Sequence, residues 1–291
     1  MAKNSLIKMP FFRAQQATKP TGVFLGAEHV WVFQSAADTS PLISRYPRPR
    51  NWPLLFRQLA ADIGPSLLQV VLGQESYQQV AVDKPAVPDN EITQALLWSV
   101  KDIVAMPPQN IYLDYFESPL AGSNKLQVVI TDKPQLSAMV QAADAEGMSF
   151  AGISVEELMP ANLFTDASQA RLVISHIPGE EVLLTVVRSG ELYMHRRIRG
   201  FKELDSATAE DLRYGIADNL SLEIQRSMDF FESQLRQPPV ASIELLVEGA
   251  SQALAHAIAV NFNQPVATVN CENVGAKMAE LALTELLRGR L

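Results

Sequence analysis

Two stretches of the chain share one order of elements, and this duplication constrains the fold more than any other feature of the sequence. Each stretch opens with a strand, a short turn and a second strand, over residues 21–33 in the first and 171–188 in the second. Apolar runs of strand length then alternate with amphipathic stretches of helical spacing. Such alternation is typical of α/β proteins with mixed sheets. The sequence therefore predicts two related lobes, each with its own mixed sheet.

The lobe boundaries follow from this repeat. We predict a first lobe over residues 20–168 and a second lobe over 169–272, with a closing helix over 273–291 that packs back on the first lobe. Hydrophobic residues make up 47% of the 291 residues, which is enough apolar side chain for a core in each lobe. Ligands of two-lobed α/β folds sit in the crevice where turns at strand ends face each other.

Hydrophobic spacing and turn residues locate the remaining elements. Helices are expected over residues 52–63, 91–106, 135–146, 208–235, 250–261 and 274–287. Further strands are expected over residues 67–72, 111–116, 126–131, 150–155, 192–199, 243–247 and 266–269. Residues 34–53 are rich in Ser, Pro and Arg and are predicted to form a loop.

Charge and composition exclude several classes of function. The net charge of −8 argues against broad nucleic-acid binding, because that requires a cationic surface. A single cysteine, Cys271, excludes an internal disulfide framework and a four-thiolate zinc site. None of the four histidines is paired at ligand spacing, so no metal site is expected. The chain also lacks a secretory apolar run, which favours a cytoplasmic protein.

Residues 1–19 form a basic tail whose charge is opposite to that of the rest of the chain. The tail holds four bases and no acid, so it carries +4 and the remainder carries −8 − 4 = −12. Apolar side chains stand between the bases, and Pro10 interrupts any helix across them. Two interpretations stay open: a segment that adsorbs to an anionic membrane surface, or a frayed terminus.

Three segments resemble the PilM/MshI group of pilus-assembly proteins, with a more distant similarity to the cytoplasmic domain of GspL. They are residues 95–103 with 113–116, residues 189–197 and residues 222–231. The resemblance extends over residues 20–291. It implies an actin-like, duplicated ribonuclease H-like fold of two lobes with mixed sheets. It also implies a cytosolic scaffold of a type IV pilus assembly system.

The resemblance further implies a nucleotide cleft, whose first phosphate turn reads Gly-Ile-Asp-Ile-Gly in the family. The Asp carboxylate of that turn holds Mg²⁺ or its water shell. Residues 22–26 of this chain read Gly-Val-Phe-Leu-Gly. Gly22 and Gly26 therefore remain, followed by Ala27, but Phe24 stands at the Asp position. A phenyl ring cannot ligate a hard cation.

The other two nucleotide turns are also incomplete. Ser175 and His176 stand where the family places an Asp-x-Gly turn, and His176 is read either as a phosphate contact or as a turn histidine without a ligand. At the adenosine turn Gly249 is one of the two usual glycines. Glu223 and Arg226 match a region that borders the base in relatives, and an exposed ion pair explains them equally well.

No catalytic residue is assigned, because general acid–base chemistry needs a positioned carboxylate that the matching positions do not supply. We therefore expect a degenerate cleft without ATP hydrolysis. Weak binding of ATP or ADP through the remaining glycines stays open. The alternative is an active, Mg-ATP-binding ATPase or kinase-like enzyme on the same fold.

In relatives, a groove on the first lobe holds the N-terminal cytosolic peptide of a single-pass inner-membrane protein. The resemblance thus implies a PilN- or MshJ-like partner, peripheral association with the cytoplasmic face of the inner membrane, and a pilus assembly ATPase as a further candidate partner. The candidate wall is the helix–strand pair 91–116, and its candidate contacts are Trp98, Ile103, Met106 and Tyr115. For Trp98 and Tyr115 a role in the core stays open as well.

Overall fold

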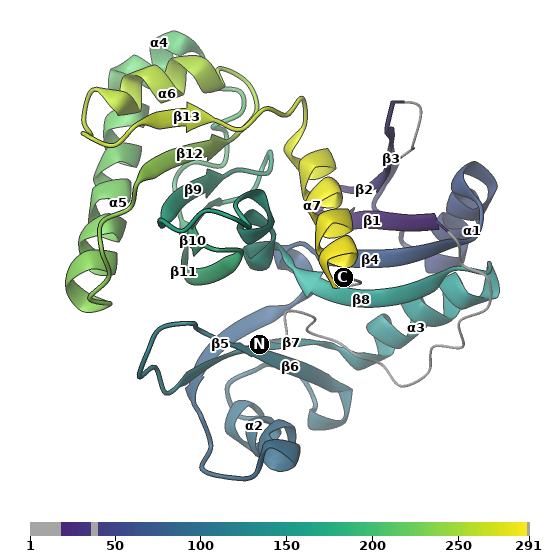
Figure 1. Cartoon of the computed structure of the whole chain (residues 1–291). Helices are drawn as coiled ribbons and strands as arrows, with labels where there is room; N and C mark the ends of the chain where they lie inside the picture. The colour runs from purple at the N-terminus through teal and green to yellow at the C-terminus, as the bar shows by residue number, and fades with distance from the viewer. Residues whose placement is uncertain (1–18, 36–39, 290–291) are drawn as a thin grey trace. The chain divides into compact units, whose positions relative to one another are not determined.

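The computed structural model describes residues 19–35 and 40–289, which form two compact units (Figure 1). Unit 1 is the described chain up to Glu156 together with residues from Met278 onward, and unit 2 is Glu157–Lys277. The basic tail, apart from Lys19, lies outside the described residues. The units divide at Glu156 and not after residue 168. One reason is that the Glu157 carboxylate pairs at 2.8 Å with Arg197 of unit 2.

A five-stranded mixed sheet forms the centre of unit 1, in the order β3-β2-β1-β4-β8. Its strands are β1 (Lys19–Leu25), β2 (His29–Gln34), β3 (Leu42–Pro47), β4 (Ser66–Leu72) and β8 (Ser149–Val155). The pairs β1–β2 and β2–β3 are antiparallel, whereas β1–β4 and β4–β8 are parallel. The apolar runs of β1 and β4 are almost fully buried, because helices cover both faces of the sheet.

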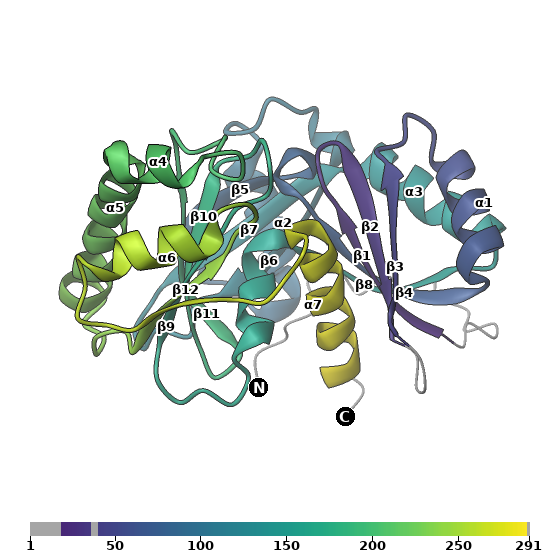
Figure 2. The ribbon, with the colours of Figure 1, turned by 90° about the horizontal axis from the view of Figure 1, so that it is seen from above.

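Three helices cover this sheet (Figure 2). Helices α1 (Trp52–Ile63) and α3 (Lys133–Ala145) lie together on one face, and α7 (Val274–Arg288) lies on the other. Gly22 of β1 lies directly beneath α7. A Cβ atom at this position would be 1.8 Å from the carbonyl oxygen of Ala279, so only glycine lets the helix approach so closely.

A smaller antiparallel sheet completes unit 1, in the order β5-β7-β6. Its strands are β5 (Gln78–Asp83), β6 (Ile111–Glu117) and β7 (Lys125–Asp132), and α2 (Ile92–Val100) packs on it. Short 3₁₀ turns, η1 (Gln74–Ser76), η2 (Asp89–Glu91) and η3 (Pro108–Asn110), connect these elements. The helix predicted over residues 91–106 ends at Val100, and residues 101–106 form turns and bends that lead to η3.

Unit 2 repeats the topology of the larger sheet of unit 1, in the order β11-β10-β9-β12-β13. The strands are β9 (Arg171–Ser175), β10 (Val182–Arg188), β11 (Glu191–Ile198), β12 (Ser242–Leu246) and β13 (Val266–Thr268). The pairs β9–β10 and β10–β11 are antiparallel, as β1–β2 and β2–β3 are in unit 1. The pairs β9–β12 and β12–β13 are parallel, as β1–β4 and β4–β8 are. The predicted duplication of the strand–turn–strand opening is therefore confirmed.

Helices α5 (Ala217–Asp229) and α6 (Ser251–Ala259) of unit 2 pack against its sheet through one apolar cluster. The short α4 (Ala209–Asp211) is exposed, and η4 (Glu156–Leu163) precedes the sheet. The prediction of one regular helix over 208–235 is wrong. Two π turns, η5 (Leu212–Ile216) and η6 (Phe230–Gln234), interrupt it, and Gly215 has φ of 116°. The backbone at Tyr214 and Gly215 is not helical, so the helix is kinked there.

Two strands of unit 1 form where no strand was predicted. β3 lies in the stretch predicted as a loop, and β5 follows β4 where no element was assigned. Both are edge strands with mostly exposed or half-buried side chains, so neither shows the strong apolar pattern of a core strand.

Candidate functional site: a pocket in unit 1 and the residues of the nucleotide turns

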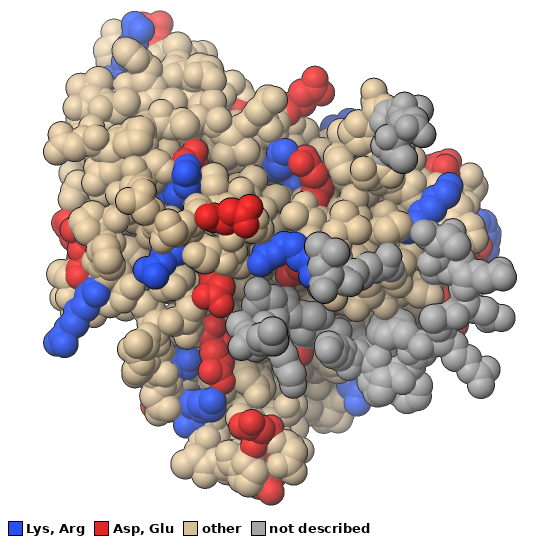
Figure 3. Space-filling view, in the orientation of Figure 1, with Lys and Arg blue, Asp and Glu red and all other residues tan. Residues whose placement is uncertain are grey.

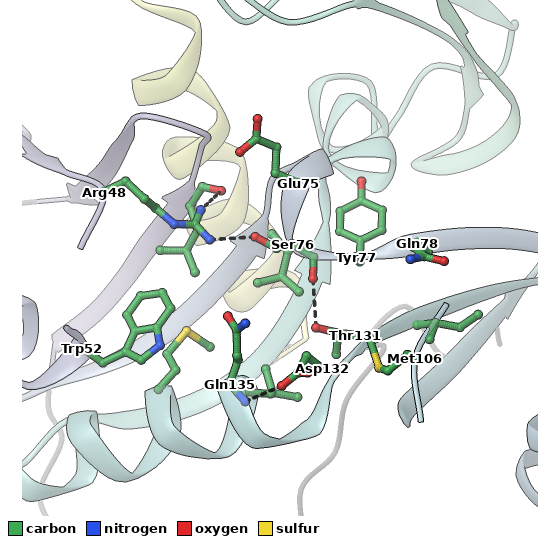
Figure 4. A pocket seen from close by; sticks show the side chains of 15 residues that line it. Arg48, Trp52, Glu75, Ser76, Tyr77, Gln78, Met106, Thr131, Asp132 and Gln135 are labelled. Carbon is green, nitrogen blue, oxygen red and sulfur yellow. Dashed lines mark hydrogen bonds between the residues drawn. The ribbon is translucent and has the colours of Figure 1, made fainter. Parts of the chain in front are cut away.

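A pocket of about 200 Å³ opens in unit 1 between the large sheet, the small sheet and the first turn of α3 (Figure 4). Its floor is apolar and its rim is polar. The residues that line it are Leu25, Arg48, Trp52, Leu72, Glu75, Ser76, Tyr77, Gln78, Met106, Ile130, Thr131, Asp132, Gln135, Leu136 and Met139.

Arg48 fixes one wall of this pocket. Its guanidinium group donates hydrogen bonds to the carbonyl oxygens of Leu25 (3.0 Å) and Gly26 (2.7 Å) and to the Ser76 hydroxyl (2.9 Å), and it lies over the Trp52 ring. This planar fork ties the β1–β2 turn to η1, as Figure 4 shows for Ser76. Because the wall is held by several bonds, the pocket is formed before any ligand arrives.

The opposite wall is tied down in the same way. The Thr131 hydroxyl of β7 donates a 2.9 Å hydrogen bond to the Ser76 carbonyl oxygen. The Asp132 carboxylate caps α3 by accepting a 2.8 Å hydrogen bond from the backbone N–H of Gln135. These bonds place the half-buried Asp132 and the exposed Gln135 at the rim (Figure 4).

The surroundings of the pocket are acidic. Glu75 is exposed at the rim and adds to the charge of Asp132, while the Arg48 cation is engaged by backbone oxygens. Asp89 and Glu91 of η2, directly before α2, are exposed as well, and Figure 3 shows acidic side chains at the bottom of the view. A ligand with basic side chains next to an apolar segment suits this surface.

Edge strand β5 begins at the pocket. Tyr77 and Gln78 line it and lead directly into β5, which is at the outer edge of the small sheet. Extended peptides bind proteins by adding a strand to such an edge while alternate side chains enter pockets. The pocket and β5 together therefore have the form of a site for an extended apolar peptide.

Only one of the four predicted partner contacts reaches this pocket. Met106 lines it. Trp98 and Ile103 are 62% and 59% exposed on the outer surface, and the Trp98 ring lies 4.2 Å from the Lys101 ammonium group. Tyr115 is half-buried against the apolar cluster beneath α2, and burial raises the pKa of its hydroxyl group. The other pocket residues were missed because they come from segments far apart in the sequence, and some of them, such as Arg48, Ser76 and Gln78, stand outside any element that was predicted. The alternation of Val80 and Val82 is the one signal that points to β5.

At the first predicted nucleotide turn, apolar packing occupies the positions that touch phosphate in relatives. Phe24 is fully buried, and its ring lies 3.1 Å from where a Cβ atom of Gly26 would be. Gly26 forms a tight turn through a 3.0 Å hydrogen bond from its N–H to the carbonyl oxygen of His29, and Ala27 is half-buried beside it. Gly22 is covered by α7, as described above. Residues 22–26, which match the family's phosphate turn, contain no carboxylate that could hold a divalent cation.

At the second turn, the side chains bond to their own unit. The Ser175 hydroxyl donates to the Leu183 carbonyl oxygen at 3.4 Å. His176 is fully buried, its backbone N–H donates to the Leu246 carbonyl oxygen, and Nε2 lies 3.2 Å from the Lys202 carbonyl oxygen. Burial lowers the pKa of the His176 imidazole and favours its neutral form. A neutral, enclosed imidazole is a poor phosphate ligand.

At the third turn, another backbone segment fills the space beside the glycine. Gly249 has φ of 74°, and a Cβ atom there would lie 2.0 Å from the carbonyl oxygen of Asp205. The preceding Glu248 carboxylate accepts a 2.8 Å hydrogen bond from the N–H of Val274, the first residue of α7. Asp205 also lies 3.9 Å from the His176 imidazole, so the second and third turns meet at this residue.

Glu223 and Arg226 form an ion pair on α5, and the Glu223 carboxylate also accepts a hydrogen bond from Arg196 of β11. The Arg226 side chain is 67% exposed. These contacts agree with the ion-pair interpretation of both residues. Over residues 19–35 and 40–289, no cluster of three His, Cys, Asp or Glu side chains that could hold a metal ion is found. Nor does that part of the chain contain a helix with the length and apolar character needed to cross a membrane.

No protein-family model and no curated protein sequence matches the chain. Several solved structures, in contrast, are similar to it in fold. The "PilM-PilN type IV pilus biogenesis complex" superposes with a TM-score of 0.63 at 17% identity, covering 94% of this chain and 99% of that one. The cytoplasmic domain of EpsL, "an inner membrane component of the type II secretion system of Vibrio cholerae", gives a TM-score of 0.53 at 14% identity, covering 91% and 94%.

A third solved structure is a protein of unknown function from Bacteroides thetaiotaomicron, described as having an actin-like ATPase fold, with a TM-score of 0.49 at 9% identity. It covers 93% of this chain and 98% of that one. Together with the repeated sheet topology, the first two similarities confirm the predicted fold class. The chain has an actin-like fold, a mixed α/β architecture built from two units with mixed sheets.

Proposed function

We propose that this protein is a scaffold of a type IV pilus assembly system. In this proposal, the pocket of unit 1 binds the N-terminal cytosolic tail of a PilN-like inner-membrane protein. The observation that carries the proposal is the preformed pocket beside edge strand β5, in a fold similar to that of the PilM-PilN complex. An apolar floor with a polar, acidic rim suits an extended peptide whose apolar side chains enter the pocket.

The proposal assigns a role to each part of the pocket. The floor, formed by Leu25, Leu72 and Met139, excludes water from one or more apolar side chains of the peptide. The edge of β5 supplies backbone hydrogen bonds, and Glu75 at the rim pairs with a basic residue that follows the apolar segment. Such an arrangement recruits the protein to the cytoplasmic face of the inner membrane through its partner.

Within this class we propose the mannose-sensitive haemagglutinin pilus, whose MshI protein the sequence resembles, with an MshJ-like partner and a pilus assembly ATPase in the same complex. We further propose that the protein acts by binding and not by ATP hydrolysis. Buried Phe24 replaces the metal-binding carboxylate, and the Asp205 backbone fills the space at Gly249. Calorimetric titration with ATP and Mg²⁺ tests this point, and heat that disappears on chelation of the metal would contradict it.

A matched pair of substitutions tests the site of peptide binding. Met106 lines the pocket, whereas Ile103 stands three residues earlier on the outer surface. Met106→Asp places a charge in the apolar part of the pocket lining and should weaken binding of the PilN-like N-terminal peptide by roughly tenfold or more, a loss of at least ~1.4 kcal/mol. Ile103→Asp should leave the affinity within a factor of about two. Fluorescence titration of the labelled peptide gives both values.

The reverse order of effects would place the binding surface outside the pocket, at the exposed side chains of Trp98 and Ile103. Absence of saturable binding to the unsubstituted protein at high micromolar peptide would contradict the scaffold proposal itself. Circular dichroism melts of both variants are the control, because equal melting temperatures show that the change in affinity does not come from unfolding.

A further inference from the structure

The sequence of this chain itself contains a segment of the kind that the unit 1 pocket fits. We propose that residues 6–12 bind this pocket in the absence of a partner, so that the N-terminal segment competes with the partner peptide. The competition rests on the proposed function, whereas occupancy of the pocket by residues 6–12 does not. Residues 1–18 lie outside the described residues, and the inference rests on their sequence and on the described pocket.

The chemistry of the segment matches the pocket. Residues 6–12 read Leu-Ile-Lys-Met-Pro-Phe-Phe, which is apolar apart from one base. Pro10 excludes a helix across the segment and biases the residue before it toward an extended backbone. An extended apolar segment is the ligand that an edge strand with a neighbouring apolar pocket selects.

The charges are complementary as well. Residues 1–18 carry three bases and no acid, while the chain after residue 19 carries −12. Glu75 and Asp132 stand at the pocket rim, where Lys8 of the segment and Arg13, which directly follows it, would meet them. Opposite charges at a rim chiefly steer and orient a ligand, and the apolar side chains supply most of the affinity.

The length of chain before β1 also fits. β1 runs from Lys19 to Leu25, and Leu25 lines the pocket. The pocket therefore lies ~20 Å along β1 from Lys19, and the chain before Lys19 must run back over that distance to reach it. Residues 13–18 span about 20 Å when extended, which brings residue 12 level with the pocket. Tethering of this kind gives an effective concentration of roughly millimolar, so a weak intrinsic affinity is enough for occupancy.

Cross-linking in the full chain tests occupancy directly. With Cys271→Ser as background, Lys8→Cys is combined either with Gln135→Cys at the rim or with Gln94→Cys on α2, which is equally exposed but outside the pocket. A short bismaleimide should join residues 8 and 135 within one chain, with roughly tenfold less product for residues 8 and 94. Equal yields, no product, or products that join two chains would overturn the inference.

Competition is measured with Phe11→Asp/Phe12→Asp in the otherwise unchanged chain. These substitutions should lower the apparent Kd for the PilN-like peptide by roughly tenfold, because the competing segment leaves the pocket. Unchanged affinity would overturn the inference and leave the proposed function intact. If the peptide binds neither chain while residues 8 and 135 still cross-link, the proposed function fails and occupancy by residues 6–12 stands.

Sedimentation with vesicles of phosphatidylglycerol and phosphatidylcholine separates this inference from a membrane-binding tail. We expect the cross-link between residues 8 and 135 to persist with vesicles present, and the unsubstituted and Phe11→Asp/Phe12→Asp proteins to sediment equally. Vesicles that abolish the cross-link and retain only the unsubstituted protein would overturn the inference in favour of membrane adsorption.

Discussion

The carboxyl group of Glu285 on α7 accepts a 2.7 Å hydrogen bond from the side-chain amide of Gln69 on β4, which joins residues 216 positions apart. A second hydrogen bond, 3.3 Å long, comes from the hydroxyl group of Ser154 on β8. Gln69 and Ser154 are buried, so the carboxyl end of the half-buried Glu285 is enclosed. This burial raises the pKa of Glu285 to about 7. α7 is therefore held on the sheet by a carboxyl group that titrates near neutral pH.

This pKa predicts the pH dependence of stability. The folded state binds the Glu285 proton more tightly than the unfolded state, so the free energy of unfolding falls as the pH rises from about 4.5 to 7 and then levels off. Glu285→Gln removes the charge, its amide oxygen can accept from Gln69, and its amide nitrogen can donate to the Ser154 hydroxyl oxygen. It should be more stable than the unsubstituted protein at pH 8, by up to about 3 kcal/mol, and equal to it near pH 4. Urea unfolding at both pH values measures the difference, and a constant difference would contradict the prediction.

Gly22→Ala should detach α7 from unit 1. The added methyl group would overlap the Ala279 carbonyl oxygen, a backbone atom that cannot move without the helix. We expect a loss of at least ~3 kcal/mol of stability, beyond ordinary overpacking. Gly289→Ala is the matched control, because its methyl group would meet nothing closer than 3.6 Å. Hydrogen exchange of α7 reads out both variants, and unchanged protection in Gly22→Ala would refute the packing described above.

Phe24 is a core residue as well as the replacement for a metal ligand. Because its ring is fully buried, Phe24→Ala should cost about 3–5 kcal/mol, as large-to-small changes in cores do. Phe24→Asp should cost more, because it buries a charge. Phe230→Ala, at a half-exposed ring of unit 2, should cost less than about 1 kcal/mol. A Phe24→Asp variant that folds normally and binds Mg-ATP would show that the turn still has the form of a nucleotide site.

Arg48→Lys should loosen the pocket without removing a charge. Lysine cannot reproduce the guanidinium fork that bonds to Leu25, Gly26 and Ser76, so we expect faster hydrogen exchange in the β1–β2 turn and in η1. Affinity for the PilN-like peptide should fall about three- to tenfold. Arg45→Lys, on exposed edge strand β3, should change neither measurement. Equal effects of the two substitutions would mean that Arg48 does not organise the pocket.

The sequence predicted the parts of the fold that depend on strong local patterns. The two strand–turn–strand openings produce the two five-stranded sheets, because their central strands are apolar on both faces. β3 and β5 escaped prediction because edge strands keep polar side chains in water, which removes the pattern that identifies a strand. The kink at Gly215 escaped prediction because Leu212, Ile216 and Leu220 keep a spacing of four residues across it, so the sequence pattern shows no break.

The pocket was harder to predict than the fold. Met106 was singled out, but Arg48 acts through backbone oxygens of β1 and a hydroxyl group of η1, and no local pattern joins these segments. Trp98 was chosen for its aromatic ring, yet it stands on the outer surface of α2. At the nucleotide turns the sequence indicated which groups are missing. Only the structure reveals that Phe24, Asp205 and α7 take up the adjacent space.

The packing of α7 on Gly22 sets the order in which the protein can be assembled during translation. Unit 2 is complete once Lys277 has emerged from the ribosome, whereas the sheet of unit 1, made first, lacks the cover of one face until the residues of α7 follow. The part of unit 1 up to Glu156 therefore exposes an apolar face of its sheet while unit 2 is synthesised and folds. Chaperones that act on nascent chains have their longest opportunity here on unit 1.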